Sequence, residues 1–470
     1  MKIHFCLFQN FPRYSKILNI TQARSYLKKK NILPLISYKF IETTKEYINQ
    51  IEPGKRVTDL PDLDHIIRLI NNKYEHRDLL DGIPINDEYR KILKQITINY
   101  ANRIDADCIC FTAFSPFVFL ILYATFIIKK YNPDIHIMIG GIQMDLSKTT
   151  FDIFNNIPEV NFAVSGDLEL ALEEYINGTL KSGFVGNVNM KELEPPIFYT
   201  PEIMMENNLL VNTSRSCPYK CSFCSGTSVG KFRYMRTSKV IETIHNINKM
   251  KKYNPHIYFT DNTFNFTRKR IYDICNGINN KIPLTAYLVY DNLDFDMIRT
   301  LKESNFHTLR LGLDAFATEK RIEANKSANI TKDQLFDLAN ETAKHDIIHQ
   351  IYLIFCMPNE SEESFQIDFE IAKELAKIYK VEVFTFLYTL SVGSDMYNNP
   401  KKYGIKYEYW DLNCVIPEIN KSINECPKYY YCSVSQKEYI NRFMRLKPIM
   451  REEKGYKSTI LEMEKYVKQS

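Results

Sequence analysis

Residues 212–224 read NTSRSCPYKCSFC, and this stretch decides how the chain is interpreted. Its three thiols, Cys217, Cys221 and Cys224, directly follow an apolar run at 209–213 that predicts a buried strand. Thiolates are the ligands of iron–sulfur clusters, and a four-iron cluster held by only three of them keeps one iron open for an added ligand. A zinc site needs a fourth Cys or His, and none follows within twenty residues. The loop is therefore predicted to hold a [4Fe–4S] cluster.

The chain beyond the cysteines alternates predicted helices and strands. Helices are expected at 238–251, 268–279, 296–304, 331–345 and 362–378. The strands that follow them are expected at 257–260, 284–289, 308–313, 350–355 and 381–387. Together with the strand before the cysteines, this pattern predicts a partial (β/α)6 TIM-like barrel, whose catalytic groups gather at the carboxyl ends of the strands.

The first two hundred residues predict a separate α/β layer. Short apolar runs indicate strands at 3–7, 32–38, 108–112, 135–139 and 161–164. Helical stretches lie between them at 21–30, 117–130 and 148–156. This alternation is typical of a Rossmann-like, doubly wound parallel sheet, which binds ligands outside the carboxyl ends of its strands. We expect a Rossmann-like domain at 1–196, a barrel domain at 197–392 and a small carboxyl-terminal cap at 393–470.

Composition limits the kinds of binding partner and the cellular compartment that we expect. The net charge of +5 over 470 residues is small, so we expect no nucleic-acid partner. Residues 108–128 carry no charge, but Ser115-Pro116 interrupts them, and a strand, turn and helix explain them better than a membrane span. The apolar start of the chain is too short for a secretory core. The eleven cysteines are accordingly expected in a reducing, cytoplasmic environment.

The spacing C-x-x-x-C-x-x-C, with an aromatic residue before the last Cys, resembles the signature of the radical S-adenosylmethionine (radical SAM) superfamily. The resemblance covers about residues 209–390. It includes segments RYMRTS at 233–238, FTDNTF at 259–264, LGLDAF at 311–316 and MPNESEESF at 357–365. The sequence departs from the family pattern at Ser216 and near Cys356, where Gly is usual, and at Asp314, where Glu is usual.

This resemblance implies roles for particular residues. Cys217, Cys221 and Cys224 would hold the cluster, whose open iron binds S-adenosylmethionine. The backbone of Phe223 would meet the adenine. Around the rest of the cofactor, Asp261 and Asn262 would lie near the methionine amino group, and Asp314 near the ribose or the methionine end.

The amino-terminal sheet resembles the cobalamin-binding domains that are fused to some radical SAM enzymes. The similar segments are DCICFT at 107–112, IMIGGIQ at 137–143 and VSGDLE at 164–169. The resemblance implies a cobalamin site formed by Thr112, Ser115, Gly140, Gly141, Gln143, Ser165 and Gly166. The D-x-H-x-x-G motif that supplies a cobalt ligand in some cobalamin proteins is missing, because His136 and Gly140 are spaced one residue too far apart. No axial ligand is predicted.

The combined resemblance implies a cobalamin-dependent radical SAM methyltransferase that acts on an unactivated carbon. In this class one S-adenosylmethionine methylates cobalamin, and another supplies the 5′-deoxyadenosyl radical that activates the substrate. An electron donor such as flavodoxin or ferredoxin is expected, and the substrate is a peptide, a lipid or a small metabolite. Two alternatives stay open: radical SAM chemistry of another kind (cyclisation, rearrangement or methylthiolation), with or without cobalamin, and a non-enzymatic iron–sulfur sensor.

Overall fold

The structure, a computed structural model, forms two compact units. It describes residues 1–8, 18–32, 34–41, 97–98, 101–113, 118–198, 208–326, 330–388, 390–405, 441–442 and 444–446. The first unit is built mainly from Met1–Asn189, and the second from Met190–Thr227 and Lys231–Tyr407. Each unit contains one large parallel sheet, as the sequence predicts.

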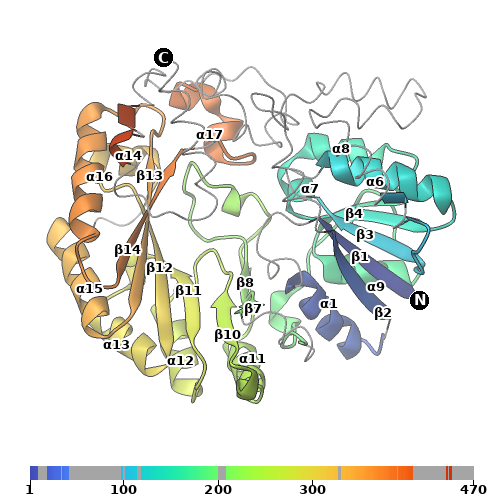
Figure 1. The fold of residues 1–470 in the computed structure, drawn as a ribbon, viewed down its shortest axis with the longest axis horizontal. Helices are drawn as coiled ribbons and strands as arrows, with labels where there is room; N and C mark the ends of the chain where they lie inside the picture. Colours follow the sequence, from blue (N-terminus) through green and yellow to red (C-terminus); the bar gives the residue numbers. More distant parts are fainter. Residues whose placement is uncertain are drawn as a thin grey trace. The chain divides into compact units, whose positions relative to one another are not determined.

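The first unit is a six-stranded parallel sheet with strand order β2-β1-β3-β4-β5-β6. Its strands are β1 (Lys2–Phe8), β2 (Leu35–Ile41), β3 (Cys108–Thr112), β4 (His136–Gly140), β5 (Phe162–Gly166) and β6 (Phe184–Gly186). Its helices are α1 (Leu18–Lys29), α6 (Val118–Tyr131), α7 (Ile142–Leu146), α8 (Lys148–Asn155) and α9 (Leu168–Ile176). Figure 1 shows α1 and α9 on one side of this sheet and α6, α7 and α8 on the other. The predicted Rossmann-like, doubly wound arrangement is confirmed.

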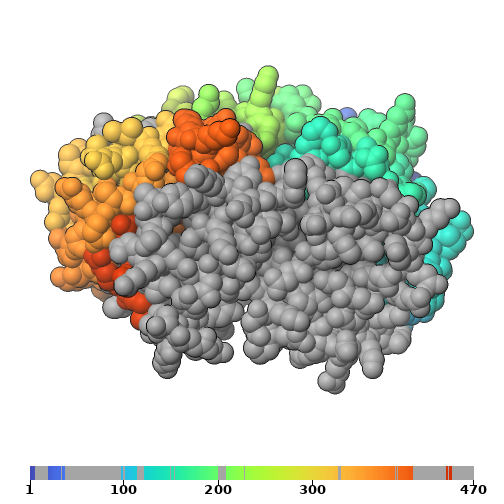
Figure 2. All heavy atoms as spheres, turned by 90° about the horizontal axis from the view of Figure 1, so that it is seen from above, coloured from blue at the N-terminus to red at the C-terminus, as the bar shows by residue number. Residues whose placement is uncertain are grey.

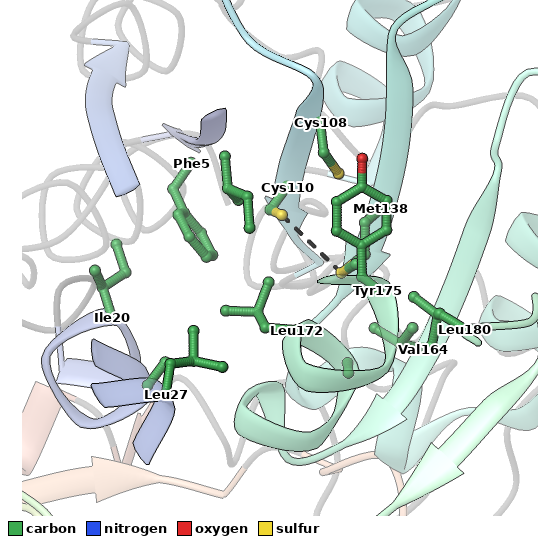
Figure 3. Packing of buried hydrophobic residues seen from close by; sticks show 13 residues of the cluster. Phe5, Ile20, Leu27, Cys108, Cys110, Met138, Val164, Leu172, Tyr175 and Leu180 are labelled. Atoms are coloured by element: carbon green, nitrogen blue, oxygen red, sulfur yellow. Dashed lines mark hydrogen bonds between the residues drawn. The ribbon is translucent and has the colours of Figure 1, made fainter. Parts of the chain in front are cut away.

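The core under α1 and α9 is apolar and closely packed. Phe5 of β1 and Leu27 of α1 lie in it with Leu172 of α9, and all three are almost fully buried (Figure 3). Cys110 belongs to the same core, where its Sγ lies 4.0 Å from Sδ of Met138. Cysteines in such positions act as small hydrophobic residues, so Cys110 is explained by packing alone.

The second unit contains a six-stranded parallel sheet with strand order β14-β13-β12-β11-β10-β7. Its strands are β7 (Asn208–Val211), β10 (His256–Phe259), β11 (Leu284–Leu288), β12 (Phe306–Asp314), β13 (Ile348–Phe355) and β14 (Val381–Leu387). The helices are α11 (Thr237–Asn248), α12 (Arg268–Gly277), α13 (Phe295–Glu303), α14 (Thr318–Glu323), α15 (Lys332–Lys344), α16 (Glu362–Leu375) and α17 (Asp395–Asn398). A short antiparallel pair, β8 (Ser214–Arg215) with β9 (Arg233–Tyr234), flanks the sheet. Helices follow one another along one side of the sheet, which confirms the partial TIM-like barrel (Figure 1).

Most predicted strands differ by one or two residues at an end, and two of the differences have a clear local reason. The strand expected at 32–38 is β2 and begins at Leu35, because Ile32 still donates its N–H to Leu27 in the last turn of α1 and Pro34 has no N–H to donate. The strand expected at 209–213 is β7 and ends at Val211, because the N–H of Thr213 donates to the carboxylate of Asp261. Helices α7, α9 and α14 were not predicted.

The helices of the described residues include none that is long and apolar enough to cross a membrane. Helix α6, which contains most of the uncharged run, has 14 residues. The chain that includes α17 lies at the surface of the second unit (orange in Figure 2), where it buries Met396 and Tyr397 and exposes Asn398.

Candidate active site

The three cysteines predicted to bind the cluster lie together on the loop that follows β8. Their side chains are partly buried and form no disulfide. Cys224 Sγ accepts the N–H of Gly226 at 3.3 Å, and Cys217 Sγ lies 3.8 Å from Oγ1 of Thr263. Burial raises the pKa of Cys221 to about 11, an effect that the ammonium of Lys326 opposes. Three thiols on one loop, with a backbone N–H directed at sulfur, are a donor set that suits an iron–sulfur cluster.

The middle of the cysteine loop is held by hydrogen bonds to two other segments of the second unit. Ser222 donates its N–H to the carbonyl of Ala324 (3.0 Å) and its hydroxyl to the carbonyl of Glu323 (2.7 Å). Its own carbonyl accepts the N–H of Met396 at the start of α17 (2.9 Å). The amide of Asn325 adds a fourth bond, to the carbonyl of Lys220 (2.6 Å). The end of α14 and the start of α17 therefore fix the loop between its cysteines.

Ser216, at a position where the family usually has Gly, adopts a left-handed backbone with φ 66°. Only glycine enters this region without strain, which explains the family preference. Ser216 offsets part of the strain by donating its hydroxyl to the carbonyl of Gly226 (3.2 Å). Its carbonyl accepts a hydrogen bond from Nδ2 of Asn262 (3.1 Å), so Asn262 lies beside the cysteine loop.

Asp261 is engaged with the protein itself. It is 1% exposed, and its carboxylate accepts the N–H and the hydroxyl of Thr213, both at 3.0 Å, and the hydroxyl of Ser214. The guanidinium of Arg270 lies behind this cluster and donates to Oγ1 of Thr213 (3.0 Å). Burial raises the pKa of Asp261, while the Ser214 hydroxyl, the Arg270 charge and the Thr213 donors oppose the rise. The carboxylate joins the end of β10 to the start of the cysteine loop.

Asp314 ends β12 in a left-handed conformation with φ 58° and forms an ion pair with Lys326, with 2.5 Å between Oδ2 and Nζ. Lys326 also donates to the carbonyl of Gly312 (3.1 Å). The charges of Asp314 and Cys221 raise the pKa of Lys326 against its burial. The structure therefore places a cation beside the cysteines and the predicted cofactor residue. Sequence reasoning missed Lys326, because it lies on the chain after α14, outside the similar motifs.

A buried ion network fixes the turn that follows Asp314. Asp368 of α16 accepts the N–H groups of Phe316 (2.8 Å) and Ala317 (2.7 Å) and pairs with Lys320 at 2.6 Å. Lys320 also pairs with Glu360, which accepts the N–H of Cys356 at 2.9 Å. The backbone of Cys356, near a usual Gly of the family, is left-handed with φ 59°. The network thus sets the carboxyl ends of both β12 and β13.

The predicted cobalamin residues of the first unit lie along one edge of its sheet. Thr112, Gly140 and Gly166 end the adjacent strands β3, β4 and β5. Gly141 and Gln143 follow β4, and Ser165 precedes Gly166; Ser115 lies outside the described residues. Thus the structure brings the described members of the set to the carboxyl edge where doubly wound sheets bind ligands.

The glycines of this edge are required by the packing of the protein itself. A Cβ on Gly166, whose φ is +96°, would lie 2.1 Å from the carbonyl oxygen of Gly186. A Cβ on Gly141, with φ +109°, would lie 2.8 Å from the carbonyl oxygen of Ala113. The turn after β5 is further fixed by Asp145, whose Oδ1 accepts the hydroxyl of Ser165 and the N–H of Gly166, both at 2.6 Å.

His136 lies at the opposite edge of the sheet, at the first residue of β4. Its Nδ1 lies 3.0 Å from the hydroxyl of Tyr175, and its ring packs edge-on against Phe162 and Tyr175. The residue is exposed, at the end of β4 opposite to Gly140.

Comparisons with known proteins match this geometry. Residues 211–384 match the radical SAM superfamily. The uncharacterized methyltransferase PH0819 of Pyrococcus horikoshii is 25% identical over 349 residues, which are 67% of this chain and 72% of the relative.

Two solved structures share the fold over nearly the whole chain. The cobalamin-dependent S-adenosylmethionine radical enzyme OxsB, with aqua-cobalamin and S-adenosylmethionine bound, is similar with a TM-score of 0.60 and 13% identity over 95% of this chain. The chain spans 66% of OxsB, just under two thirds of its length. The radical S-adenosylmethionine methyltransferase TsrM from Kitasatospora setae, with cobalamin and a [4Fe–4S] cluster bound, is similar with a TM-score of 0.63 and 12% identity, over 96% of this chain and 92% of TsrM.

The matched residues contain the cysteine loop, the strand ends around it and four of the six strands of the second sheet in full. Residues 211–384 therefore form a radical SAM domain, and the chain shares its fold with OxsB and TsrM.

Proposed function

We propose that this protein is a cobalamin-dependent radical SAM methyltransferase that acts on an unactivated carbon. The observation that carries the proposal is the three-thiol loop at the carboxyl end of a partial barrel, in one chain with a separate doubly wound sheet. OxsB and TsrM, which share the fold of this chain, both bind cobalamin, and TsrM also binds a [4Fe–4S] cluster. The methyltransferase name of PH0819 supports the same reaction.

In the second unit, Cys217, Cys221 and Cys224 would hold the [4Fe–4S] cluster. When bound, the cluster supplies the electron that cleaves S-adenosylmethionine, and cobalamin supplies a carrier for the methyl group. The protein's own part is to hold the thiols in one loop, through the bonds that Ser222 makes to α14 and α17. A reductant such as flavodoxin or ferredoxin is the proposed partner.

The S-adenosylmethionine site is proposed to use Lys326, Asn262 and Asp314. Lys326 presents its ammonium next to Cys221, where it suits the carboxylate of the methionine part, and Asp314 orients that ammonium through their ion pair. Asn262 would lie near the methionine amino group, and the backbone of Phe223 would lie against the adenine. Asp261 acts as a positioning residue, because its carboxylate is occupied by Thr213 and Ser214.

In the first unit, the carboxyl edge formed by Thr112, Gly140, Gly141, Ser165 and Gly166 is the proposed cobalamin site, with Gln143 and Ser115. Backbone groups and hydroxyls line the described part of this edge, and His136 lies at the other end of its strand. The residues present fit a cobalamin held by its ring, without a cobalt ligand from β4. Oxygen-sensitive thiolates and reduced cofactors need a reducing compartment, so we infer a cytoplasmic location.

The proposal is tested by expression with cobalamin available and purification without oxygen, followed by iron and cobalt analysis. We expect about four irons per chain, as a three-thiolate cluster of this type requires, and about one cobalt. Dithionite with S-adenosylmethionine should yield 5′-deoxyadenosine, and Cys221→Ala should abolish it. Iron without cobalt would show a radical SAM enzyme of other chemistry and overturn the methyltransferase proposal. Failure to bind iron would overturn the cluster assignment.

A further inference from the structure

One face of the second sheet carries aromatic and polar side chains instead of the branched aliphatic residues that usually fill a barrel. Along β10 and β12, buried residues under the helices alternate with half-buried residues on the other face. Tyr258, Tyr287, Arg310 and Tyr352 belong to this second set and come from four adjacent strands. The ring centroids of Tyr287 and Tyr352 are each 6.1 Å from a neighbouring tyrosine of the set.

Arg310 is the cation of this face. Its guanidinium carbon lies 4.7 Å from the ring centroid of Tyr258 and 5.3 Å from that of Tyr287, and one NH2 group donates to the hydroxyl of Tyr287 at 2.9 Å. Its Nε is buried and has no acceptor among the described residues. Within the same residues, no carboxylate forms an ion pair with Arg310, and the titratable groups nearest to it are tyrosines.

The neighbour of Arg310 on β13 supplies no acceptor. Gln350, which is in register with Arg310, donates to Glu382 at 2.8 Å and accepts the hydroxyl of Tyr352 at 3.1 Å. Burying a cation without an anion is costly, and aromatic faces compensate only in part. The arrangement therefore suits an anion that arrives with a ligand.

The same face leads to the proposed S-adenosylmethionine site. Arg310, Gly312 and Asp314 share one face of β12, so the position between the two charged residues has no side chain. The nearest atoms to a Cβ on Gly312 are those of the Asp314 carboxylate itself. At a strand rise of about 3.3 Å per residue, Gly312 lies about 7 Å along the strand from Arg310, and a shift of register separates Gly312 from Asp314. A molecule anchored at Arg310 can extend over Gly312 towards the cofactor.

The charge of the face selects a monoanion. Burial lowers the pKa of His256 to about 4, and His307 and Arg310 add to the effect, so His256 is neutral at pH 7. Glu382 lies two strands from Arg310 and repels a second negative group. With one permanent cation, Arg310, and one protein carboxylate, Glu382, the face suits a ligand carboxylate better than a phosphate dianion. The guanidinium fork also has the geometry to bind a carboxylate.

We propose that Arg310 binds the carboxylate of the substrate, whose aromatic or apolar body packs against Tyr287 and Tyr352. This inference rests on the proposed function, since it names the substrate class of that enzyme. It predicts that the methylated compound is a carboxylic acid. The reacting carbon is separated from the acid group by about the length of β12 between Arg310 and Asp314.

Binding of a matched pair of probes, phenylacetate and phenylacetamide, tests the inference. Ligand-observed NMR titrations use the anaerobic holoenzyme with saturating S-adenosylmethionine, so that the proposed cofactor site is already filled. The wild-type protein should bind phenylacetate at least about tenfold more tightly than phenylacetamide, the loss expected for one charge-assisted contact. Arg310→Met should weaken phenylacetate binding about tenfold and leave phenylacetamide unchanged.

The control variant is Arg299→Met, which removes an exposed arginine on α13 and should change neither affinity. If Arg310→Met does not fold, Arg310→Lys keeps the charge but loses the fork, and should still weaken phenylacetate binding several-fold. Phenylacetate binding that does not depend on residue 310 in a folded variant would overturn the inference.

Cleavage of S-adenosylmethionine by dithionite, measured on the same samples, separates this inference from the proposed function. Arg310→Met should retain the cleavage rate, because Arg310 contacts none of the cluster cysteines. A wild-type protein that cleaves no S-adenosylmethionine refutes the proposed function, whatever the probes do. If the wild-type protein cleaves S-adenosylmethionine but Arg310→Met binds phenylacetate as tightly as the wild type, the substrate class alone is refuted.

Discussion

At the scale of single residues, the adjacent residues Asp261 and Asn262 have different structural roles. Asp261 is buried, and its carboxylate accepts donors from Thr213 and Ser214. Asn262 is exposed, and its side chain donates a hydrogen bond to the carbonyl of Ser216. The resemblance to the family assigns both of them to the cofactor, whereas the geometry makes Asp261 a brace for the cysteine loop.

Substitution at these two positions should separate the roles. Asp261→Asn puts an amide NH2 where several donors need an acceptor, and each donor left unsatisfied costs about 1–3 kcal/mol of the free energy of unfolding. Asn262→Ala removes one hydrogen bond, worth about 0.5–1.5 kcal/mol. Anaerobic urea unfolding should therefore give a clearly lower midpoint for Asp261→Asn. Equal midpoints for the two variants would show that Asp261 is no brace.

The proposed cluster ligands stand out in the sequence because their signal is local. Cys217, Cys221 and Cys224 stand together in the sequence, and the strand before them is a short apolar run. Lys326 and Arg310 carry no such local signal. A lysine or an arginine indicates a binding site only when folding buries it, and burial cannot be read from these positions in the sequence. Their positions depend on contacts between distant strands and loops, which single-sequence patterns do not encode.

At the scale of elements, the four-residue helix α17 and the turn after it form a compact charged clip. Asp395 accepts hydrogen bonds from Lys402 (2.8 Å), Asn399 (2.6 Å) and the hydroxyl of Tyr403. Hydrogen bonds from Lys402 and Tyr403 lower the pKa of Asp395 to about 2. Because Met396 bonds to Ser222, the stability of the clip bears on the cysteine loop.

The clip should give a measurable dependence on pH. Since its pKa is lower in the folded protein than the usual value near 3.9, ionised Asp395 stabilises the fold above about pH 4, and this contribution is lost as the pH falls towards 2. The side chain is 41% exposed, so solvent screening limits the effect to about 0.2–1 kcal/mol. The difference in thermal midpoint between wild type and Asp395→Asn should be largest near pH 6 and shrink below pH 4.

Asp273→Asn, which removes an exposed acid on α12, serves as the control for loss of one negative charge. A difference between wild type and Asp395→Asn that grows on acidification would contradict the assignment.

The elements themselves were largely readable from hydrophobic periodicity, and the errors are instructive. The helices of the second unit alternate with its strands in the regular order that the sequence indicates. The strand that became β2 was placed too early, because Ile32 is apolar yet belongs to the end of α1. Helices α7 and α14 have five and six residues, too few for a periodic pattern to stand out.

At the scale of the whole molecule, the chain divides into two units with separate sheets and separate cores. Units with their own cores fold largely on their own, so damage to one should leave the other intact. The proposed cofactors are divided in the same way, with cobalamin on the first sheet and the cluster on the second.

Two variants should therefore lose different metals. Gly166→Ala places a Cβ 2.1 Å from the carbonyl oxygen of Gly186 and distorts the edge of the first sheet, so the cobalt content should fall while iron stays near four per chain. Cys221→Ala should lose iron and keep cobalt. Gly178→Ala, another left-handed glycine of the first unit but with nothing within 4 Å, should keep both metals. Metal analysis of the purified proteins decides this, and joint loss in either variant would argue against independent units.

The four hydrogen bonds that hold the cysteine loop have one further consequence, for repair. They run from Ser222 to Glu323 and Ala324, from Met396 to Ser222, and from Asn325 to Lys220, and none of them involves a sulfur atom. A chain that has lost its iron to oxygen thus keeps the shape of the loop that must receive the next cluster. If the loop holds the proposed cluster, oxidative loss of that cluster should then be reversible by reloading iron and sulfide into the same chain.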